Sequence, residues 1–525
     1  MNDSVTNSTS AALQPTEVVR GAIPQLEAIE SLSDAPESVD ALVVPTFAGE
    51  SGMEIAGGPG DPFSQSQQIK LWKALISIGA TGEKNEAVTL PGAVIELEAP
   101  EVHTIIAVGL GDPDDVTEED VREAAGVASR KIKAATSEDE QPRGAVAVST
   151  LGIFGTEAAL VGHGLGAYSY PGAKKAKPGV DTIYSLAYHE EEGAAARAAV
   201  IVEGVAVARD LVNAPANVLY PETYAEFIGQ IAANDDVDIE VLDETQLAEQ
   251  GFGGIIGVGK GSARPPRLVR MTYTPSNAGE STPSVALVGK GITFDTGGIS
   301  LKPGANMDHM ISDMGGSAAV VGATLAAARL ELPVKVTATI PLAENMPSSS
   351  ATRPGDILRH YNGLTTEVLN TDAEGRLILA DAISRACEDE PDYLIETATL
   401  TGAQLVALGE RTPGIMGSIA FRDRVSQLSQ DVGENGWPMP LPAELGEALK
   451  SDVADLKNIS SSRWGGMSVA GHYLSNFVTE GVEWVHIDVA GPAFNTGSAH
   501  GYTPKRGTGV PVRTIIAALE DIAQG

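Results

Sequence analysis

The sequence predicts an α/β protein of two domains, a smaller N-terminal α/β domain and a larger C-terminal α/β domain around a central mixed sheet. Short apolar runs alternate with helix-like segments along most of the 525 residues. Several of these runs are apolar throughout, as in strands that are covered on both faces. A long helical stretch ends at Asn213-Ala214-Pro215, a stop signal between the two sets of runs. We expect a tail at 1–24, domains at 25–190 and 214–525, and a connecting helix at 191–213.

The N-terminal domain is expected to contain four buried strands and two helices. The strands are predicted where short apolar runs occur, at 41–47, 104–110, 144–150 and 182–188. The helices are predicted at 118–136 and 156–170. The preceding tail, which begins MNDSVTNSTSAALQPTEVVR, is expected to be disordered because it is polar and lacks both regions of a signal peptide.

The C-terminal domain is expected to contain seven strands with helices between them. The strands are predicted at 238–244, 267–275, 284–291, 334–343, 367–370, 393–400 and 484–491. Helices are expected near 306–330 and 374–388. Small residues dominate 312–330, which predicts close packing of that helix against its neighbours.

The composition restricts the possible partners. With 35 basic and 70 acidic residues the net charge is −35, which disfavours nucleic acid and anionic membranes as partners. We find no window of about 18 uncharged apolar residues and expect no transmembrane span. The one cysteine, Cys387, excludes an internal disulfide and favours a reducing compartment. It is expected to be buried on the inner face of a helix.

A first charged cluster follows the apolar run at 284–291. Lys290 and Asp295 lie at the C-terminal end of this expected strand, the edge where open α/β sheets bind ligands. A lysine can ligate a metal only when its amine is neutral, which requires a depressed pKa. The alternative for Lys290 is a simple pair with Asp295. Asp313 and Lys302 also have structural alternatives, a helix-dipole acid and a turn lysine respectively.

A second charged cluster, NTDAEGRL at 370–377, lies between an expected strand and an expected helix. Asp372 and Glu374 flank Ala373, and Arg376 follows. They could be helix-start acids with an ion-pair partner. Oxygen ligands at such a junction also hold divalent cations, and two such ions sharing carboxylates fit this inventory. A carboxylate-dominated set suits Mn²⁺, Mg²⁺ or a dinuclear Zn²⁺ centre.

Other motifs are absent or incomplete. The segment 254–261 nearly matches a phosphate-binding P-loop, but Gly261 stands where Ser or Thr is required. There is no HExxH zinc motif and no GxSxG nucleophile elbow. His472 and His486 are interpreted as structural residues.

The two clusters together resemble the leucyl (cytosol) aminopeptidase family of dinuclear metallo-exopeptidases. The resemblance rests on a set of motifs that covers most of residues 200–525: NTDAEGRL (370–377), VGKGITFDTGGISLKP (288–303), DMGG (313–316), RPGD (353–356), ATLTGA (398–403) and DVAGPA (488–493). The N-terminal third matches only in its α/β pattern and is similar to the smaller macro-like domain of that family.

The resemblance implies a role for each charged residue. Asp295 and Glu374 would bridge two divalent ions, Mn²⁺ or Zn²⁺. Lys290 and Asp313 would complete the shell of one metal, and Asp372 that of the other. Lys302 and Arg376 would be the catalytic pair, with a bicarbonate ion bound by the residues Ala373, Gly375, Arg376 and Leu400. The substrate pocket would be formed by Met310, Asn370, Thr399 and Gly402.

The resemblance also implies an activity. The protein would remove N-terminal residues, preferably leucine or other apolar ones, from short peptides with a free N-terminus. It would serve intracellular peptide turnover as a cytoplasmic homohexamer. Two alternatives stay open at this point: a dinuclear metal phosphoesterase, and a non-enzymatic DNA-binding or scaffold protein.

Overall fold

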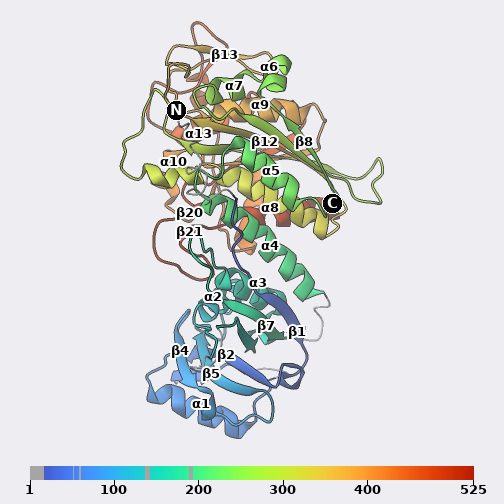
Figure 1. Cartoon of the computed structure of the whole chain (residues 1–525), viewed down its shortest axis with the longest axis vertical. Helices are drawn as coiled ribbons and strands as arrows, with labels where there is room; N and C mark the ends of the chain where they lie inside the picture. The colour runs from blue at the N-terminus through green and yellow to red at the C-terminus, as the bar shows by residue number, and fades with distance from the viewer. Residues whose placement is uncertain (1–16, 51, 58–60, 136–141, 188–192) are drawn as a thin grey trace, which may run out of the picture.

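The computed structural model describes residues 17–50, 52–57, 61–135, 142–187 and 193–525. Figure 1 shows two α/β domains at opposite ends of an elongated molecule, joined by the helix α4 (Ala194–Asn213). The predicted two-domain α/β class is confirmed. Parts of four expected segments (1–16 of the tail, 136, 188 and 191–192) lie outside the described residues.

The N-terminal domain contains a seven-stranded sheet in the order β1-β7-β6-β2-β5-β4, with β3 paired to β2. The strands are β1 (Gln25–Ile29), β2 (Ser38–Gly49), β3 (Gly52–Ile55), β4 (Ala87–Pro91), β5 (Glu101–Gly109), β6 (Ala145–Ser149) and β7 (Val180–Leu186). Its helices are α1 (Gln65–Ser77), α2 (Glu118–Ser129) and α3 (Thr156–Ala167). The four buried strands and two helices that the sequence predicts correspond to β2, β5, β6, β7, α2 and α3.

The segment 17–24 differs from the expected disordered tail. The Arg20 guanidinium pairs with Asp210 on α4 at 2.6 Å and with Glu203 at 2.7 Å. The backbone of Ala22 exchanges hydrogen bonds with Ser169. This part of the predicted tail is therefore packed against the connecting helix, because its arginine meets two carboxylates there.

The C-terminal domain contains a nine-stranded mixed sheet in the order β17-β16-β19-β15-β10-β12-β9-β8, with β11 paired to β12. Its strands are β8 (Val237–Leu242), β9 (Arg267–Tyr273), β10 (Ser284–Gly289), β11 (Gly291–Asp295), β12 (Lys335–Asn345), β15 (Tyr393–Ala398), β16 (Gly414–Gly417), β17 (Trp437–Pro438) and β19 (Glu483–Asp488). The four central strands β12, β10, β15 and β19 are parallel, whereas β9 and β16 run antiparallel to them.

Each face of this sheet carries its own apolar core. On β10, Val285 and Leu287 belong to one core, while Ala286 and Val288 belong to the other. The first core includes α4, α5 (Pro221–Ile231), α8 (Gly315–Arg329) and α14 (Val512–Gln524). The second includes α6 (Glu244–Gln250), α7 (Gly253–Gly259), α9 (Gly375–Cys387) and α13 (Gly466–Ser475). Cys387 is buried at the end of α9, as expected.

The C-terminal domain also contains β13 (Ile357–Arg359), β14 (Thr365–Glu367), β18 (Leu456–Lys457), β20 (Phe494–Asn495), β21 (Arg506–Gly507), α10 (Gly402–Leu408), α11 (Ile419–Asp431), α12 (Ala443–Glu447) and the 3-10 helix η4 (Met307–Ser312). The strand predicted at 367–370 is wrong, because β14 ends at Glu367 and pairs with β13 and β18 in a separate sheet. The segment 254–261, which nearly matches a P-loop, lies largely within the helix α7 and does not form a loop.

The helix expected at 306–330 is present as η4 followed by α8. The stretch Met307–Arg329 is long and apolar enough to cross a membrane. However, 89% of its most apolar 18-residue part is buried inside the protein. It is therefore a core helix. Its small residues allow close contact with α4, where a Cβ built on Gly322 would lie 2.3 Å from the carbonyl oxygen of Gly204.

The buried side chain of Arg209, in α4, contacts both domains. The Arg209 guanidinium donates to the carbonyl oxygens of Leu165 at 2.7 Å, Tyr502 at 3.2 Å and Thr508 at 2.9 Å. Leu165 belongs to the N-terminal domain, whereas Tyr502 and Thr508 belong to the C-terminal domain. Arg209 is only 1% exposed, so this contact fixes the connecting helix to both domains.

Candidate metal centre and active site

Three carboxylates meet at the C-terminal edge of the large sheet. Asp295 is the last residue of β11, and Asp372 and Glu374 lie in the loop that leads into α9. One oxygen from each side chain lies within 4.8 Å of the others. The loop reaches this edge because α9 packs against β10 and β12 and begins immediately after Glu374. The two charged clusters of the sequence thus form one site.

Lys290 lies beside two carboxylates of the site, those of Asp313 and Glu374. Its Nζ lies 2.7 Å from Asp313 Oδ1 and 3.0 Å from Glu374 Oε1, and it donates to the carbonyl of Thr399 at 2.9 Å. Burial alone would lower the pKa of Lys290, but attraction to Asp313, Glu374 and Asp295 raises it above its usual value. A protonated amine has no lone pair, so Lys290 can ligate a metal only after it loses its proton. That loss requires a bound cation to replace the ammonium as the partner of these carboxylates.

Lys302 lies beside the other two carboxylates of the site, those of Asp295 and Asp372. Its ammonium lies 2.8 Å from Asp295 Oδ2 and also pairs with Asp372. The loop that carries it turns back toward the site through Gly297 and Gly298, which both have positive φ. Gly297 needs this freedom, because a Cβ there would lie 2.5 Å from the carbonyl oxygen of Ser300.

The residues present fit divalent cations. The donor set is rich in carboxylate oxygen, the ligand type that hard and borderline divalent ions prefer. Asp313 Oδ2 and Glu374 Oε2 are buried and have no hydrogen-bond partner within the described part of the chain. Burial, together with repulsion from neighbouring carboxylates, raises the pKa of Asp313, Glu374 and Asp372. The four carboxylates outnumber the two ammonium groups of Lys290 and Lys302, and bound cations would balance the remaining negative charge.

Arg376 lies in the first turn of α9, beside this cluster. Its guanidinium donates to the carbonyl of Asn458 at 2.7 Å and lies 5.9 Å from the centre of the Tyr473 ring. Burial lowers its pKa, yet an arginine stays protonated in proteins. Its Nε is buried and has no hydrogen-bond partner within the described residues, which leaves a donor for a small anion.

The remaining expected site residues differ in what they contact. The Thr399 hydroxyl donates to Asp313 Oδ1 at 2.9 Å, so this side chain supports an expected ligand. Gly402 is the first residue of α10, and a Cβ added there would meet no atom within 4 Å. The Asn370 side chain stabilises the loop in which it lies, because its Oδ1 accepts from the amide of Asp372 at 2.9 Å. Met310 lies in η4, before Asp313.

Two of the amides expected to bind bicarbonate already have partners. The Ala373 amide donates to the carbonyl of Asn370 at 3.2 Å, and the Leu400 amide donates to Asp488 Oδ1 at 3.2 Å. An anion at Arg376 would compete with these two bonds. Gly375 is required for a different reason, because a Cβ there would lie 2.6 Å from Cε of Lys290.

Sequence reasoning missed several neutral residues that support the site. Asn345, at the end of β12, donates to Asp295 Oδ1 at 2.8 Å and to the carbonyl of Thr371 at 3.0 Å. Asn458 donates to the carbonyl of Asn370 at 2.6 Å in addition to accepting from Arg376. Asn345 ends an apolar run at the sheet edge that carries Asp295, and that position is a usable signal. We find no sequence signal for Asn458.

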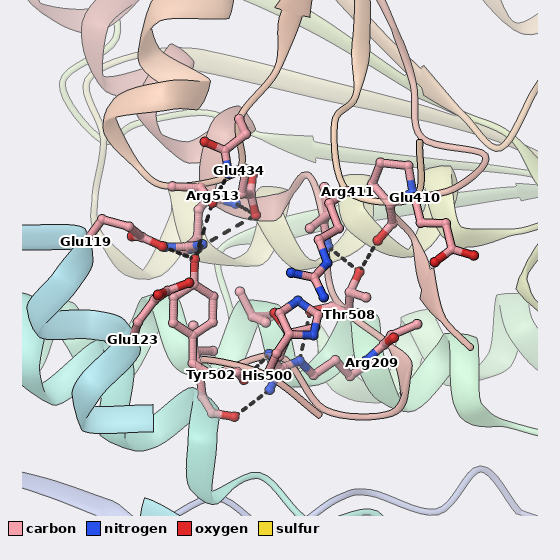
Figure 2. A pocket seen from close by; sticks show the side chains of 18 of the residues that line it. Glu119, Glu123, Arg209, Glu410, Arg411, Glu434, His500, Tyr502, Thr508 and Arg513 are labelled. Carbon is pink, nitrogen blue, oxygen red and sulfur yellow. Dashed lines mark hydrogen bonds and ion pairs between the residues drawn. The ribbon is translucent and has the colours of Figure 1, made fainter. Parts of the chain in front are cut away.

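A separate cavity of about 310 Å³ lies at the domain junction. Figure 2 shows Glu119 and Glu123 of α2 on one side, Arg411 on the other, and Arg209 below. The Tyr502 hydroxyl donates to Glu119 at 2.6 Å. The lining includes none of the expected site residues, so we assign the chemistry to the carboxylate cluster rather than to this cavity.

Comparison with known proteins gives the family. The model of the cytosol aminopeptidase family catalytic domain matches residues 206–516, and that of the family's N-terminal domain matches residues 43–177. The chain belongs to the cytosol aminopeptidase family. It is therefore a metal-dependent aminopeptidase, and the phosphoesterase and non-enzymatic alternatives find no support.

Individual relatives match over nearly the whole chain. Two proteins named "Probable cytosol aminopeptidase" are each 52% identical, one from Corynebacterium diphtheriae and one from Nocardia farcinica. They cover 96% and 95% of this chain and 98% of their own lengths. Among solved structures, the bottromycin maturation enzyme BotP is 34% identical with a TM-score of 0.79, covering 93% of this chain and 100% of its own. A mutant of tomato leucine aminopeptidase is 28% identical with a TM-score of 0.80, covering 97% and 99%.

Proposed function

We propose that this protein removes leucine and other apolar N-terminal residues from short peptides, with two divalent ions at the carboxylate cluster. The observation that carries this proposal is the meeting of Asp295, Asp372 and Glu374 within 4.8 Å, flanked by two lysines and a buried arginine. Asp295 and Glu374 would bridge the two ions. Lys290 and Asp313 would complete one shell, and Asp372 the other.

The metals proposed are Mn²⁺ or Zn²⁺. A BotP structure in complex with Mn supports manganese, and the oxygen-rich ligand set accommodates either ion. Two ions bound here would polarise the scissile carbonyl and lower the pKa of a water molecule.

The chain's own cationic residues would complete the chemistry. The Lys302 ammonium, which pairs with Asp295 and Asp372, would donate to the oxygen of the scissile carbonyl as negative charge develops there. The four carboxylates are committed as ligands, so none is left to accept a proton. Arg376 would instead hold a bicarbonate ion for that purpose, with Ala373, Gly375 and Leu400 beside it.

The pocket and the assembly are part of the same proposal. Met310, Asn370, Thr399 and Gly402 would surround the N-terminal side chain of the substrate. We further propose a cytoplasmic homohexamer that serves peptide turnover, with domain boundaries at 25–190, 191–213 and 214–525. Light scattering that gives the mass of a monomer would contradict the hexamer.

The activity is tested with leucine-p-nitroanilide, with and without Mn²⁺, and with the N-acetylated substrate as control. We expect Mn²⁺-dependent cleavage of the free substrate alone. Undiminished cleavage of the blocked substrate would contradict an exopeptidase.

The bridging role is tested by Glu374→Gln, with the exposed Glu388→Gln as matched control. We expect Glu374→Gln to lose metal and at least about 100-fold in kcat, because one bridging carboxylate is removed. Glu388→Gln should retain both. Survival of metal content and activity in Glu374→Gln would show that the bridging assignment is wrong.

A further inference from the structure

The segment Thr399–Thr401 contacts two expected metal ligands without belonging to a strand or a helix. The strand β15 ends at Ala398 and α10 begins at Gly402. Between them, the Thr399 carbonyl accepts from Lys290 at 2.9 Å and the Thr399 hydroxyl donates to Asp313 at 2.9 Å. Because no sheet ladder fixes these three residues, their position must come from other contacts.

Asp488 supplies those contacts. It is the last residue of β19, lies opposite Ala398 in the parallel register, and is fully buried. Its Oδ2 accepts from the Thr401 hydroxyl at 2.7 Å, and its Oδ1 accepts from the amides of Leu400 at 3.2 Å and Thr401 at 3.4 Å. The amide of Ala490 also donates to Oδ1, at 3.2 Å.

Further hydrogen bonds join the same two segments. The Val489 amide donates to the carbonyl of Ala398 at 2.8 Å. Gln404, in α10, accepts from the amide of Gly491 at 2.8 Å. The motifs ATLTGA (398–403) and DVAGPA (488–493) thus lie against each other, since Val489 bonds Ala398 and Asp488 bonds Leu400 and Thr401.

We propose that Asp488 is a positioning residue of the metal centre: through Leu400 and Thr401 it holds Thr399 against Lys290 and Asp313. Within the described part of the chain Asp488 has no hydrogen bond to an expected metal ligand, so its hydrogen bonds reach the ligands through this segment. The inference rests on the proposed function of Lys290 and Asp313 as ligands. Removal of outer contacts of this kind typically weakens metal binding by about 10–100-fold.

The test compares three variants of the full-length protein. Thr401→Val removes the 2.7 Å hydrogen bond to Asp488 with little change in volume, and Thr401→Ser restores a hydroxyl. Thr324→Val is the matched control, because this buried threonine in α8 bonds only the carbonyl of Val320. For each protein we would measure Mn²⁺ binding by calorimetry, the thermal midpoint, and kcat and KM at saturating Mn²⁺.

We expect Mn²⁺ binding to weaken about 10–100-fold in Thr401→Val and to recover in Thr401→Ser, whereas Thr324→Val should lower only the thermal midpoint. Equal Mn²⁺ affinity in Thr401→Val and the unaltered protein would overturn the proposal, as would an equal loss in Thr324→Val. The proposed function is tested separately, by hydrolysis in the unaltered protein. A protein that binds Mn²⁺ but hydrolyses nothing would refute that function while the positioning role is still measured.

Discussion

Asn345 shows how strongly this centre depends on residues without charge. Its amide nitrogen bonds Asp295 at the end of β11 and the carbonyl of Thr371 in the loop before α9. It therefore connects the two halves of the ligand set, which are about 75 residues apart in the sequence. This contact adds to the ion pairs of Lys302 with Asp295 and Asp372, which join the same two segments.

Asn345→Ala is expected to weaken metal binding by about 10–100-fold, because Asp295 loses one of the donors that orient it. Calorimetric titration with Mn²⁺ measures this effect. Asn362→Ala serves as control, since Asn362 lies in an exposed turn where it accepts only from the amide of Leu364. Equal affinity in the two variants would show that Asn345 does not orient the site.

Asp40 predicts a pH-dependent contribution to stability. Burial opposes its charge, but hydrogen bonds from Arg143 and from the amides of Val146 and Ala135 lower its pKa below 3.8. Its stabilisation is therefore complete above the unfolded pKa and is lost as pH falls through the lower folded pKa.

Asp40→Asn should reduce the free energy of unfolding by about 1–3 kcal/mol at pH 7. The difference from the unaltered protein should shrink as pH falls below 3.8, because the unfolded carboxylate is protonated first, and it should vanish below the folded pKa, where the carboxylate is protonated in both states. Chemical denaturation at several pH values measures it. A difference that stays constant from pH 7 to pH 3 would contradict this account.

At the scale of elements, the crossing of α4 and α8 depends on two glycines. A Cβ on Gly322 would lie 2.3 Å from the carbonyl oxygen of Gly204, and one on Gly204 would lie 2.9 Å from that of Gly322. Backbone atoms cannot move aside as flexible side chains can. Gly322→Ala is therefore expected to cost about 1–3 kcal/mol through forced separation of the helices.

Gly229→Ala is the matched control for this crossing. A Cβ on Gly229, in α5, meets nothing within 4 Å, so alanine should stabilise the helix by about 0.5–1 kcal/mol. Thermal unfolding of both variants gives the comparison. Stabilisation by Gly322→Ala would show that the helices are not in close contact.

The sequence predicted the buried elements well and the edges poorly. Continuous apolar runs identified β2, β5, β10 and β12, because strands covered on both faces have little choice of residue type. The edge strand β1 was missed since three of its five residues are exposed. The run at 367–370 was assigned to the wrong sheet, because apolar character shows burial but not which strand is the neighbour.

The candidate site divides in the same way. The charged residues expected as ligands were predicted by their residue types and motifs, and the structure brings these residues together. Asn345, Asn458 and Asp488 were not predicted as site residues, because their roles arise from tertiary contacts with residues about 50 to 90 positions away.

For the whole molecule, we expect Arg209 to couple the unfolding of the two domains, because it bonds carbonyl oxygens in both. Arg209→Met would leave the carbonyl oxygens of Leu165, Tyr502 and Thr508 without this donor. We expect a loss of at least about 2 kcal/mol and a calorimetric transition that separates into two. Arg353→Met, at a side chain that is 73% exposed, should change stability by about 1 kcal/mol or less. A single, unshifted transition in Arg209→Met would contradict the coupling.

The partners of Arg209 also set an order of events during synthesis. Tyr502 and Thr508 follow Arg209 by 293 and 299 residues. At about 5–20 residues per second, the ribosome needs roughly 15–60 s to add them. Until then the emerging α4 carries a cation whose C-terminal acceptors do not yet exist. The junction therefore closes only after Thr508 has been added, and a chain that stops before this residue lacks two of the three acceptors of Arg209.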